Sequence, residues 1–321
     1  MKKEKLEIVD EKKQKIKKAR FFAGAVLLSV ALLTQATPAK VYENHNLTED
    51  LKYTIAHAGG GLETSDGKFR KYLNCEESFY KYYENGTRMF EYDLVFTSDN
   101  ELVGTHKFEY LDGYSLNNRI SYEDYLNTKI ADEFTGITAD KILDLIEKYP
   151  DTKFVIDTKE KDDYKVYEKL IEDAEEKGVD ISKNVLPFVS SKEMLSKLEK
   201  RYNFEEYLFT NYKQNYTTDQ LVEIFKSNDK IKYLHIFFYD FVKLDLKKIN
   251  SMGIRVFAHM DKSDKTMYPI DYGCSGVFTD DMTENYFSEN CKDFLFEKFQ
   301  KNKKFSDSKI RILQLDDSKS L

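Results

Sequence analysis

Residues 89–95, MFEYDLV, and residues 153–159, KFVIDTK, decide the fold, because each is a short apolar run that carries acidic side chains. Glu91 and Asp93 lie two apart in the first run, so on a β-strand they share one face. Two carboxylates on one face of a buried strand repel each other and lose hydration, which a divalent cation would offset. Oxygen-only ligands suit Mg²⁺ or Ca²⁺, and Asp157 is the natural third ligand.

The same carboxylates have an alternative set of partners. Lys159, two residues after Asp157, or Arg88, just before the first run, could form an ion pair with one carboxylate while the other faces water. The pattern favours the metal site over this alternative, and both interpretations stay open at the level of sequence.

Around these two runs, short apolar segments alternate with longer amphipathic ones along 321 residues. This alternation predicts a parallel sheet with right-handed helical crossovers, and the length suits an α/β fold of the TIM (β/α)8 barrel type. Nine strands are predicted, so one is extra or belongs to a rim hairpin: 53–56, 89–95, 102–105, 153–157, 185–189, 207–210, 233–238, 254–258 and 276–279. The predicted helices are 76–85, 138–148, 164–177, 191–201, 218–227 and 244–252, and residues 107–135 are predicted as a long loop or small insertion.

Two histidines stand at the ends of predicted strands, beside turns that contain glycine. His57 opens HAGGG and His106 closes LVGTH. Because a barrel carries its chemistry at the C-terminal ends of its strands, we expect both histidines near the carboxylates. Imidazoles titrate near neutral pH, so one could act as general base and the other as general acid. His259 is the main rival, since it too ends a strand, whereas His235 is expected in the core or at the rim.

Composition excludes several other classes of function. Residues 1–20 contain nine Lys or Arg and four Asp or Glu, so with a net charge of −7 the rest of the chain carries −12. An acidic body without a basic stripe argues against nucleic-acid binding. Cys75, Cys274 and Cys291 show neither a pairing pattern nor a metal knuckle. The sequence has no GxSxG elbow, phosphate loop or dinucleotide fingerprint.

The N-terminal region predicts export. A basic tail, residues 1–20, precedes an uncharged, largely apolar segment, residues 21–39, whose length is close to the roughly 20 residues that span a bilayer. A single-pass anchor with the body outside the cytoplasm is favoured, and a signal peptide cleaved near Ala36 or Ala39, which would give a secreted protein, is the alternative. Beyond this segment we predict a linker over residues 40–52, the barrel over residues 53–300 and a polar tail over residues 301–321.

The order of these motifs resembles the glycerophosphodiester phosphodiesterase family over most of residues 53–285. The resemblance rests on IAHAGGG, NCEESFYKYYENGTRMFEYDLVFTSDNELVGTHK, FVIDTKE and SGVFTDD, whose closing motif includes Thr279 and Asp280. It implies a TIM barrel that cleaves a phosphodiester with two histidines and a divalent metal. The implied roles are acid/base catalysis by His57, which activates the glycerol hydroxyl, and His106; metal binding by Glu91, Asp93 and Asp157; and substrate binding by Lys159 and Asn74.

Three positions depart from the family's pattern, and they keep other functions open. Ala58 replaces an Arg that contacts phosphate, Lys107 replaces an Asp, and Asp157 replaces a Glu. A surface barrel that has lost catalysis and binds a phosphorylated polymer or partner is therefore the alternative to hydrolysis of a glycerophosphodiester or a related lipid or wall-polymer headgroup. A phospholipase acting on intact lipid is a third possibility. Both histidines and all three metal carboxylates are present, which favours the hydrolase.

Overall fold

The structure of the chain is a computed structural model. It describes residues 53–106, 111, 118–160, 163–212, 214–237, 240, 243–259 and 273–287. No helix within these residues is long and apolar enough to cross a bilayer. The predicted basic tail, apolar segment, linker and C-terminal tail, together with His45, Lys107 and Cys291, lie outside the described residues.

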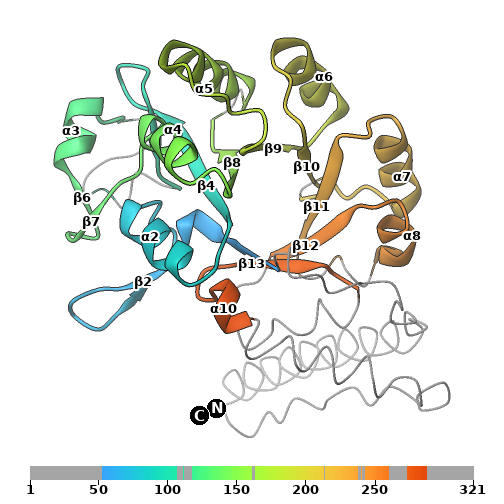
Figure 1. Cartoon of the computed structure of the whole chain (residues 1–321), viewed down its shortest axis with the longest axis horizontal. Coiled ribbons are helices and arrows are strands. Elements are labelled where there is room, and N and C mark those ends of the chain that lie inside the picture. Colours follow the sequence, from blue (N-terminus) through green and yellow to red (C-terminus); the bar gives the residue numbers. More distant parts are fainter. Residues whose placement is uncertain are drawn as a thin grey trace, which may run out of the picture. The chain divides into compact units, whose positions relative to one another are not determined.

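Parallel strands close into a barrel with helices on its outside, which confirms the predicted TIM-type architecture (Figure 1). The ring closes because β1 pairs with β13 on one side and with β4 on the other. In order around the ring, the eight strands are β1 (Thr54–Ala56), β4 (Met89–Phe96), β8 (Lys153–Thr158), β9 (Val185–Val189), β10 (Tyr207–Thr210), β11 (Ile231–Phe237), β12 (Arg255–His259) and β13 (Gly276–Thr279).

The ninth predicted strand is the extra one. β5 (Leu102–Gly104) pairs antiparallel with the far half of β4, so the two form a rim hairpin. Asn100 adopts a left-handed φ of 67° in the turn between them, a conformation that Asn tolerates better than most residues. Thr105 N–H then donates to the Asp93 carbonyl at 2.9 Å. His106 therefore follows the rim hairpin, which is the extra ninth strand, and does not follow a strand of the barrel itself.

The helices follow the predicted segments closely, because several of them begin at Ser or Thr residues that cap helix N-termini. Thr138, Ser191 and Thr217 each accept a hydrogen bond from the third backbone N–H of the helix that follows. The outer helices are α2 (Glu76–Glu84), α4 (Ala139–Lys148), α5 (Asp163–Lys177), α6 (Lys192–Arg201), α7 (Thr218–Lys226) and α8 (Leu246–Asn250).

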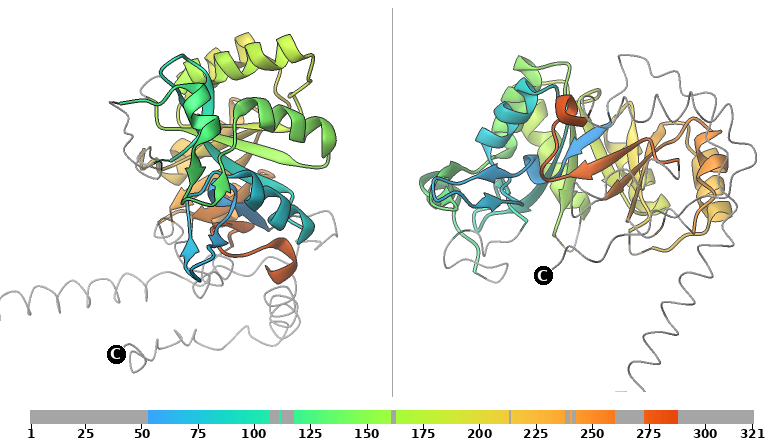
Figure 2. Two further views of the ribbon diagram at one scale, coloured as in Figure 1. Left: turned by 90° about the vertical axis from the view of Figure 1, so that its left-hand side faces the viewer. Right: turned by 90° about the horizontal axis from the view of Figure 1, so that it is seen from below.

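Several short elements were not predicted individually. The described part of the 107–135 segment is a small insertion outside the ring of strands (Figures 1 and 2). It contains α3 (Tyr122–Asn127) and a hairpin of β6 (Lys129–Ile130) and β7 (Phe134–Thr135). The other unpredicted elements are the 3-10 turn η1 (His57–Gly59), the hairpin of β2 (Leu62–Glu63) and β3 (Phe69–Arg70), and α10 (Glu284–Phe287).

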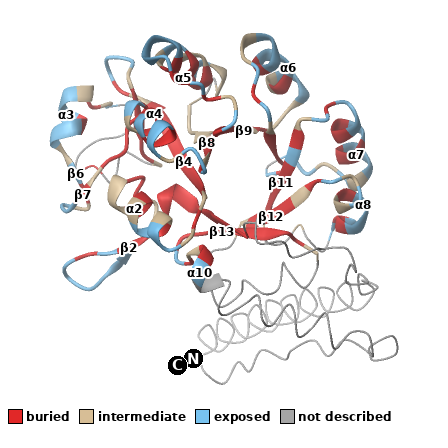
Figure 3. Ribbon diagram, viewed as in Figure 1, coloured by how far each residue is buried: buried red, intermediate tan, exposed pale blue. Residues whose placement is uncertain are grey.

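The strands of the barrel consist mostly of buried residues (Figure 3). Because side chains alternate along a strand, these residues form two sets. One set points outward and packs beneath the helices, as Phe90, Tyr92 and Phe154 do. The other set fills the barrel interior with an apolar layer: Ile55, Met89, Val155, Leu186, Leu208, Tyr233, Phe257 and Phe278. Two residues further along the strands, the same inward face carries Glu91 and Asp157. The barrel is therefore apolar at its base and polar above it.

The glycine turn after β1 predicts a measurable cost for Gly60→Ala. Gly60 has a φ of 96°, and a Cβ there would lie 2.5 Å from the ring of Tyr82, which is buried. Left-handed strain and overpacking together should cost about 2–4 kcal/mol of unfolding free energy in urea. Gly178 is the matched control, because its φ is 74° but nothing lies within 4 Å of an added Cβ. Equal losses in both variants would show that the Tyr82 clash contributes nothing.

Candidate active site

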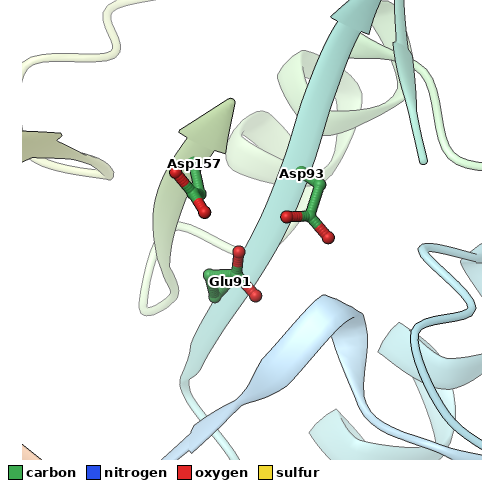
Figure 4. A group of neighbouring side chains, drawn as sticks. All are labelled: Glu91, Asp93 and Asp157. Atoms are coloured by element: carbon green, nitrogen blue, oxygen red, sulfur yellow. The ribbon is translucent and has the colours of Figure 1, made fainter. Parts of the chain in front are cut away.

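Glu91, Asp93 and Asp157 gather at the inner face of β4 and β8 (Figure 4). Parallel pairing sets Asp93 directly opposite Asp157, and Glu91 lies two residues before Asp93. One oxygen of each carboxylate lies within 4.8 Å of the others. Oxygens at this spacing can share one cation with bonds of about 2.0–2.6 Å. The three carboxylates thus lie together as predicted and could hold a divalent ion, while their role as ligands of Mg²⁺ or Ca²⁺ stays a prediction.

Lys159 also contacts this cluster, so the two interpretations made from the sequence are not exclusive. Its Nζ lies 2.8 Å from Asp93 Oδ1 and 2.5 Å from Asp157 Oδ2. Burial disfavours the ammonium, but the two carboxylates outweigh it and raise the pKa of Lys159. Arg88 is not a partner of the cluster, because it pairs with Asp151 at 2.7 Å.

Glu91 and Asp93 are pushed apart in their pKa values. Burial, and then repulsion from Asp93, raises the pKa of Glu91. Burial would also raise the pKa of Asp93, but the Lys159 ammonium, together with His106 and His57, outweighs it and the pKa falls. An added cation would therefore stabilise the ionised form of Glu91, whereas Asp93 is already stabilised as an anion by Lys159.

His57 lies in η1, directly after β1, and a carboxylate fixes its ring. Its Nδ1 lies 2.8 Å from Asp280 Oδ1, and Lys71 Nζ contacts the other oxygen of Asp280 at 3.0 Å. Asp280 is an acceptor, so Nδ1 carries the proton and Nε2 is the atom left for proton transfer. Nε2 lies 3.9 Å from Glu91 Oε2, which places this imidazole beside the carboxylate cluster.

When His57 is neutral and all four carboxylates are ionised, the charges joined by these contacts do not cancel. Four carboxylates face two ammonium groups, which leaves two negative charges: Glu91, Asp93, Asp157 and Asp280 against Lys71 and Lys159. Buried unpaired charge is costly, so the site is suited to a divalent cation.

Metal affinity should rise with pH, because protons bound at the site compete with the cation. Burial lowers the pKa of His57, but the Asp280 hydrogen bond and the nearby carboxylates outweigh it and raise the pKa to about 9. In the metal-free protein this shift stabilises the fold below pH 6.5, and the stabilisation is lost as pH rises through 9. A cation must displace the protons, so its affinity should increase about tenfold per pH unit for each proton released. Calorimetric titrations at pH 6, 7, 8 and 9 test this, and a pH-independent affinity would contradict it.

His106 reaches the same site through the rim hairpin. Its ring lies 4.8 Å from that of Tyr72, and Tyr72 lies 4.7 Å from His57, as measured between ring centroids. The structure thus brings both predicted histidines to one place, although only His57 follows a barrel strand.

Asn74 is turned towards Asp93. Its amide nitrogen donates to Asp93 Oδ2 at 3.1 Å, and its amide oxygen accepts from Asp93 N–H at 2.9 Å. The side chain is fully buried. These contacts position Asp93 within the carboxylate cluster, while the substrate-binding role implied by the family resemblance stays a prediction.

The other two described histidines form an aromatic wall. The ring of His259 lies 4.4 Å from that of His57, and burial lowers its pKa to about 3. Burial also lowers the pKa of His235 well below the usual value, and its Nδ1 contacts the Thr210 hydroxyl at 2.9 Å. Both rings are therefore neutral at physiological pH. The rival placement of His259 is borne out in space, but its pKa does not suit acid/base work near neutral pH.

Three site residues were not given a role from the sequence. Asp280 stood only as part of a matched motif, Lys71 lies in a polar stretch, and Tyr72 is one of 23 tyrosines. Only Asp280 had a usable signal, since it is an acidic residue at the end of a predicted strand. Ala58, which departs from the family's pattern, donates its backbone N–H to Glu91 Oε2 at 2.7 Å.

Comparisons with known proteins place the fold. By sequence, the chain matches no family model and no curated protein. A glycerophosphodiester phosphodiesterase of Parabacteroides distasonis matches with a TM-score of 0.57 and 16% identity, over 78% of this chain and 99% of its own. A Galdieria sulphuraria protein proposed to be such an enzyme gives 0.58 and 17%, over 77% and 98%. An Oleispira antarctica phosphodiesterase in complex with the product sn-glycerol-3-phosphate gives 0.56 and 15%, over 74% and 96%.

Proposed function

We propose that this chain, which has the fold of the glycerophosphodiester phosphodiesterases, hydrolyses a glycerophosphodiester to an alcohol and glycerol phosphate with the help of a divalent metal. The observation that carries the proposal is the contact between two kinds of group. His57, held by Asp280, lies 3.9 Å from Glu91 of the carboxylate cluster, so an acid/base group and a cation site face one substrate position.

The residues divide the proton transfers between them. His57 accepts the proton of the attacking hydroxyl at Nε2, while Asp280 holds its Nδ1–H and stabilises the imidazolium that forms. A new bond from the attacking oxygen to phosphorus forms as the bond from phosphorus to the leaving alcohol breaks, and His106 gives the leaving oxygen a proton. Where the attacking hydroxyl belongs to the glycerol, this step gives a cyclic phosphate, and a water molecule then opens it to glycerol phosphate while the two histidines exchange roles. A divalent ion held by Glu91, Asp93 and Asp157 would neutralise charge on the phosphate and lower the pKa of His57 into the working range.

Fixed cations favour a phosphate ligand at this position. Lys159 and Lys71 each keep part of their side chain exposed while their ammonium groups bind site carboxylates. Both therefore stand where they can also attract a phosphodiester anion. A substrate whose phosphate is shared between glycerol and a lipid or wall-polymer headgroup fits this charge pattern.

Hydrolysis by the purified full chain tests the proposal. The substrates are glycerophosphocholine, glycerophosphoethanolamine, glycerophosphoinositol, a lysophospholipid and a glycerophosphate polymer, each with Mg²⁺, with Ca²⁺ and with chelator. We expect metal-dependent release of glycerol phosphate from at least one of them. Absence of turnover on every substrate, with metal bound and the fold intact, would refute the proposal.

A second candidate function is binding without catalysis, and Ala58 is the observation that favours it. The site lacks the arginine that the family resemblance places there. If this loss silences the enzyme, the folded, metal-loaded chain should still bind a glycerophosphate polymer and should gain no turnover from any metal. Equilibrium binding measured beside the hydrolysis panel separates the two functions.

We also propose that residues 21–39 tether the barrel outside the cytoplasm, near lipid or wall-polymer substrates. The support is the basic tail and the uncharged run that follows it. The chain should be found in the membrane fraction of the cells. Protease added to the outside of intact cells should then degrade its barrel. A mature chain that begins near residue 37 or 40 and is found in the medium would favour secretion instead.

A further inference from the structure

Tyr72 occupies the space between the two candidate catalytic histidines. Its ring meets His57 edge-on, with centroids 4.7 Å apart and planes at 80°, and meets His106 at 4.8 Å and 58°. Within the described residues, each histidine thus has the same aromatic neighbour. A single side chain therefore packs against both imidazoles, beside the Asp280 contact that fixes one of them.

The backbone of Tyr72 is held in a conformation that tyrosine rarely adopts. Its φ is 58°, in the left-handed region, where a bulky side chain is strained. Strain of this kind persists only where the surrounding structure enforces it, and it gathers at functional sites. Here the strained residue is also the one whose ring touches both histidines.

The neighbours of Tyr72 show what enforces the strain. On one side, Lys71 Nζ contacts Asp280 Oδ2 at 3.0 Å. On the other, Leu73 is buried, and the backbone N–H of Asn74 donates to the Ala58 carbonyl at 2.9 Å while its side chain binds Asp93. Both flanks are thus fixed to residues that hold His57 and the metal cluster, so Tyr72 moves only if the site moves.

We infer that Tyr72 is a positioning residue whose aromatic ring holds His57 and His106 at the separation and tilt that proton transfer on opposite sides of one phosphodiester requires. This inference rests on the proposed function, and it assigns the effect to the ring rather than to the phenolic hydroxyl. A small displacement of a catalytic group can cost about 100-fold in rate, so the ring should matter although it exchanges no proton.

Three substitutions in the full chain separate ring, hydroxyl and backbone. Tyr72→Phe keeps the ring and should keep kcat within about threefold. Tyr72→Leu and Tyr72→Gly remove it and should lower kcat by about 10- to 100-fold with KM nearly unchanged. Tyr72→Gly also relieves the left-handed strain. Ala131→Gly is its matched control, because Ala131 has a φ of 51° in the turn between β6 and β7 and should change only stability.

A spectroscopic measurement keeps this test independent of the activity. In Tyr72→Leu the ring-proton resonances of both His57 and His106 should shift through loss of the aromatic ring, while those of His235 stay in place. The inference would be overturned by any of three results: histidine resonances that do not move in Tyr72→Leu, a Tyr72→Leu variant with full kcat, or a Tyr72→Phe variant as slow as Tyr72→Leu. A wild-type chain inert on every diester would instead count against the proposed function, and the resonances would still decide the placement of the histidines.

Discussion

Replacement of His57 by alanine is expected to lower kcat on the best diester by about 10³-fold, within the 10²–10⁴-fold range that general acid–base catalysis contributes. The reason is the geometry of one ring, since Asp280 fixes Nδ1 and leaves Nε2 beside the cluster. Initial rates at saturating substrate, with thermal unfolding as the check on folding, measure the effect. A loss below about tenfold would remove His57 from the mechanism.

The leaving group then distinguishes the acid from the base. His106→Ala should be equally slow on an alkyl diester, but a nitrophenyl leaving group needs no proton and should restore most of its rate. His57→Ala should stay slow on both substrates, because the attacking hydroxyl still needs a base. The opposite pattern would exchange the two assignments. His57→Gln is the matched control, because its side-chain amide can still donate a hydrogen bond to Asp280 but cannot transfer a proton.

Substitution of Glu91 by glutamine is expected to change stability in opposite directions with and without metal. In the metal-free protein burial and Asp93 raise the pKa of Glu91, so its carboxylate must take up a proton on folding near neutral pH; glutamine avoids this cost, and unfolding should need about 1–2 kcal/mol more. With metal it removes a ligand, and affinity should fall by more than about 100-fold, because loss of an outer partner alone costs 10- to 100-fold. Turnover at low metal should fall in step with the affinity.

Calorimetric metal titrations and thermal unfolding with and without chelator measure this pair of effects. Glu206→Gln is the matched control, because Glu206 pairs with Lys153 at 2.7 Å, at the opposite end of β8 from the cluster, and should leave the metal affinity unchanged. Destabilisation of the metal-free Glu91→Gln protein would show that Glu91 is already compensated by other groups. Unchanged metal binding would exclude it as a ligand.

Local signals in the sequence account for most of the fold. β9, β10 and β13 have the predicted bounds, and the helix caps at Thr138 and Ser191 lie where the predicted segments begin. Short strands and capped helices depend on neighbours in the chain, so their positions can be predicted without tertiary information. The small insertion was harder, because α3 and its hairpin are too short to carry a periodic pattern.

The site was predictable where its residues share a strand. The spacing of Glu91 and Asp93 fixes them on one face, and the repeated pattern points to Asp157 on a neighbouring strand. Asp280 could not be given a role in this way, because its partner His57 lies 223 residues away in the chain. The position of Tyr72 between two histidines depends on the left-handed conformation of its own backbone, which no sequence motif predicts.

By itself, the sequence determined the alternation of strands and helices, the face that Glu91 and Asp93 share, and the residue types needed for acid/base and metal chemistry. Only the tertiary structure decided that His106 returns on a rim hairpin, that Asp280 and Lys71 hold His57, and that His259 is a neutral neighbour. The physical reason is the distance along the chain over which each kind of interaction acts. Periodicity and capping act over a few residues, whereas the pKa and orientation of a buried group depend on charges that only closure of the barrel brings within 4 Å.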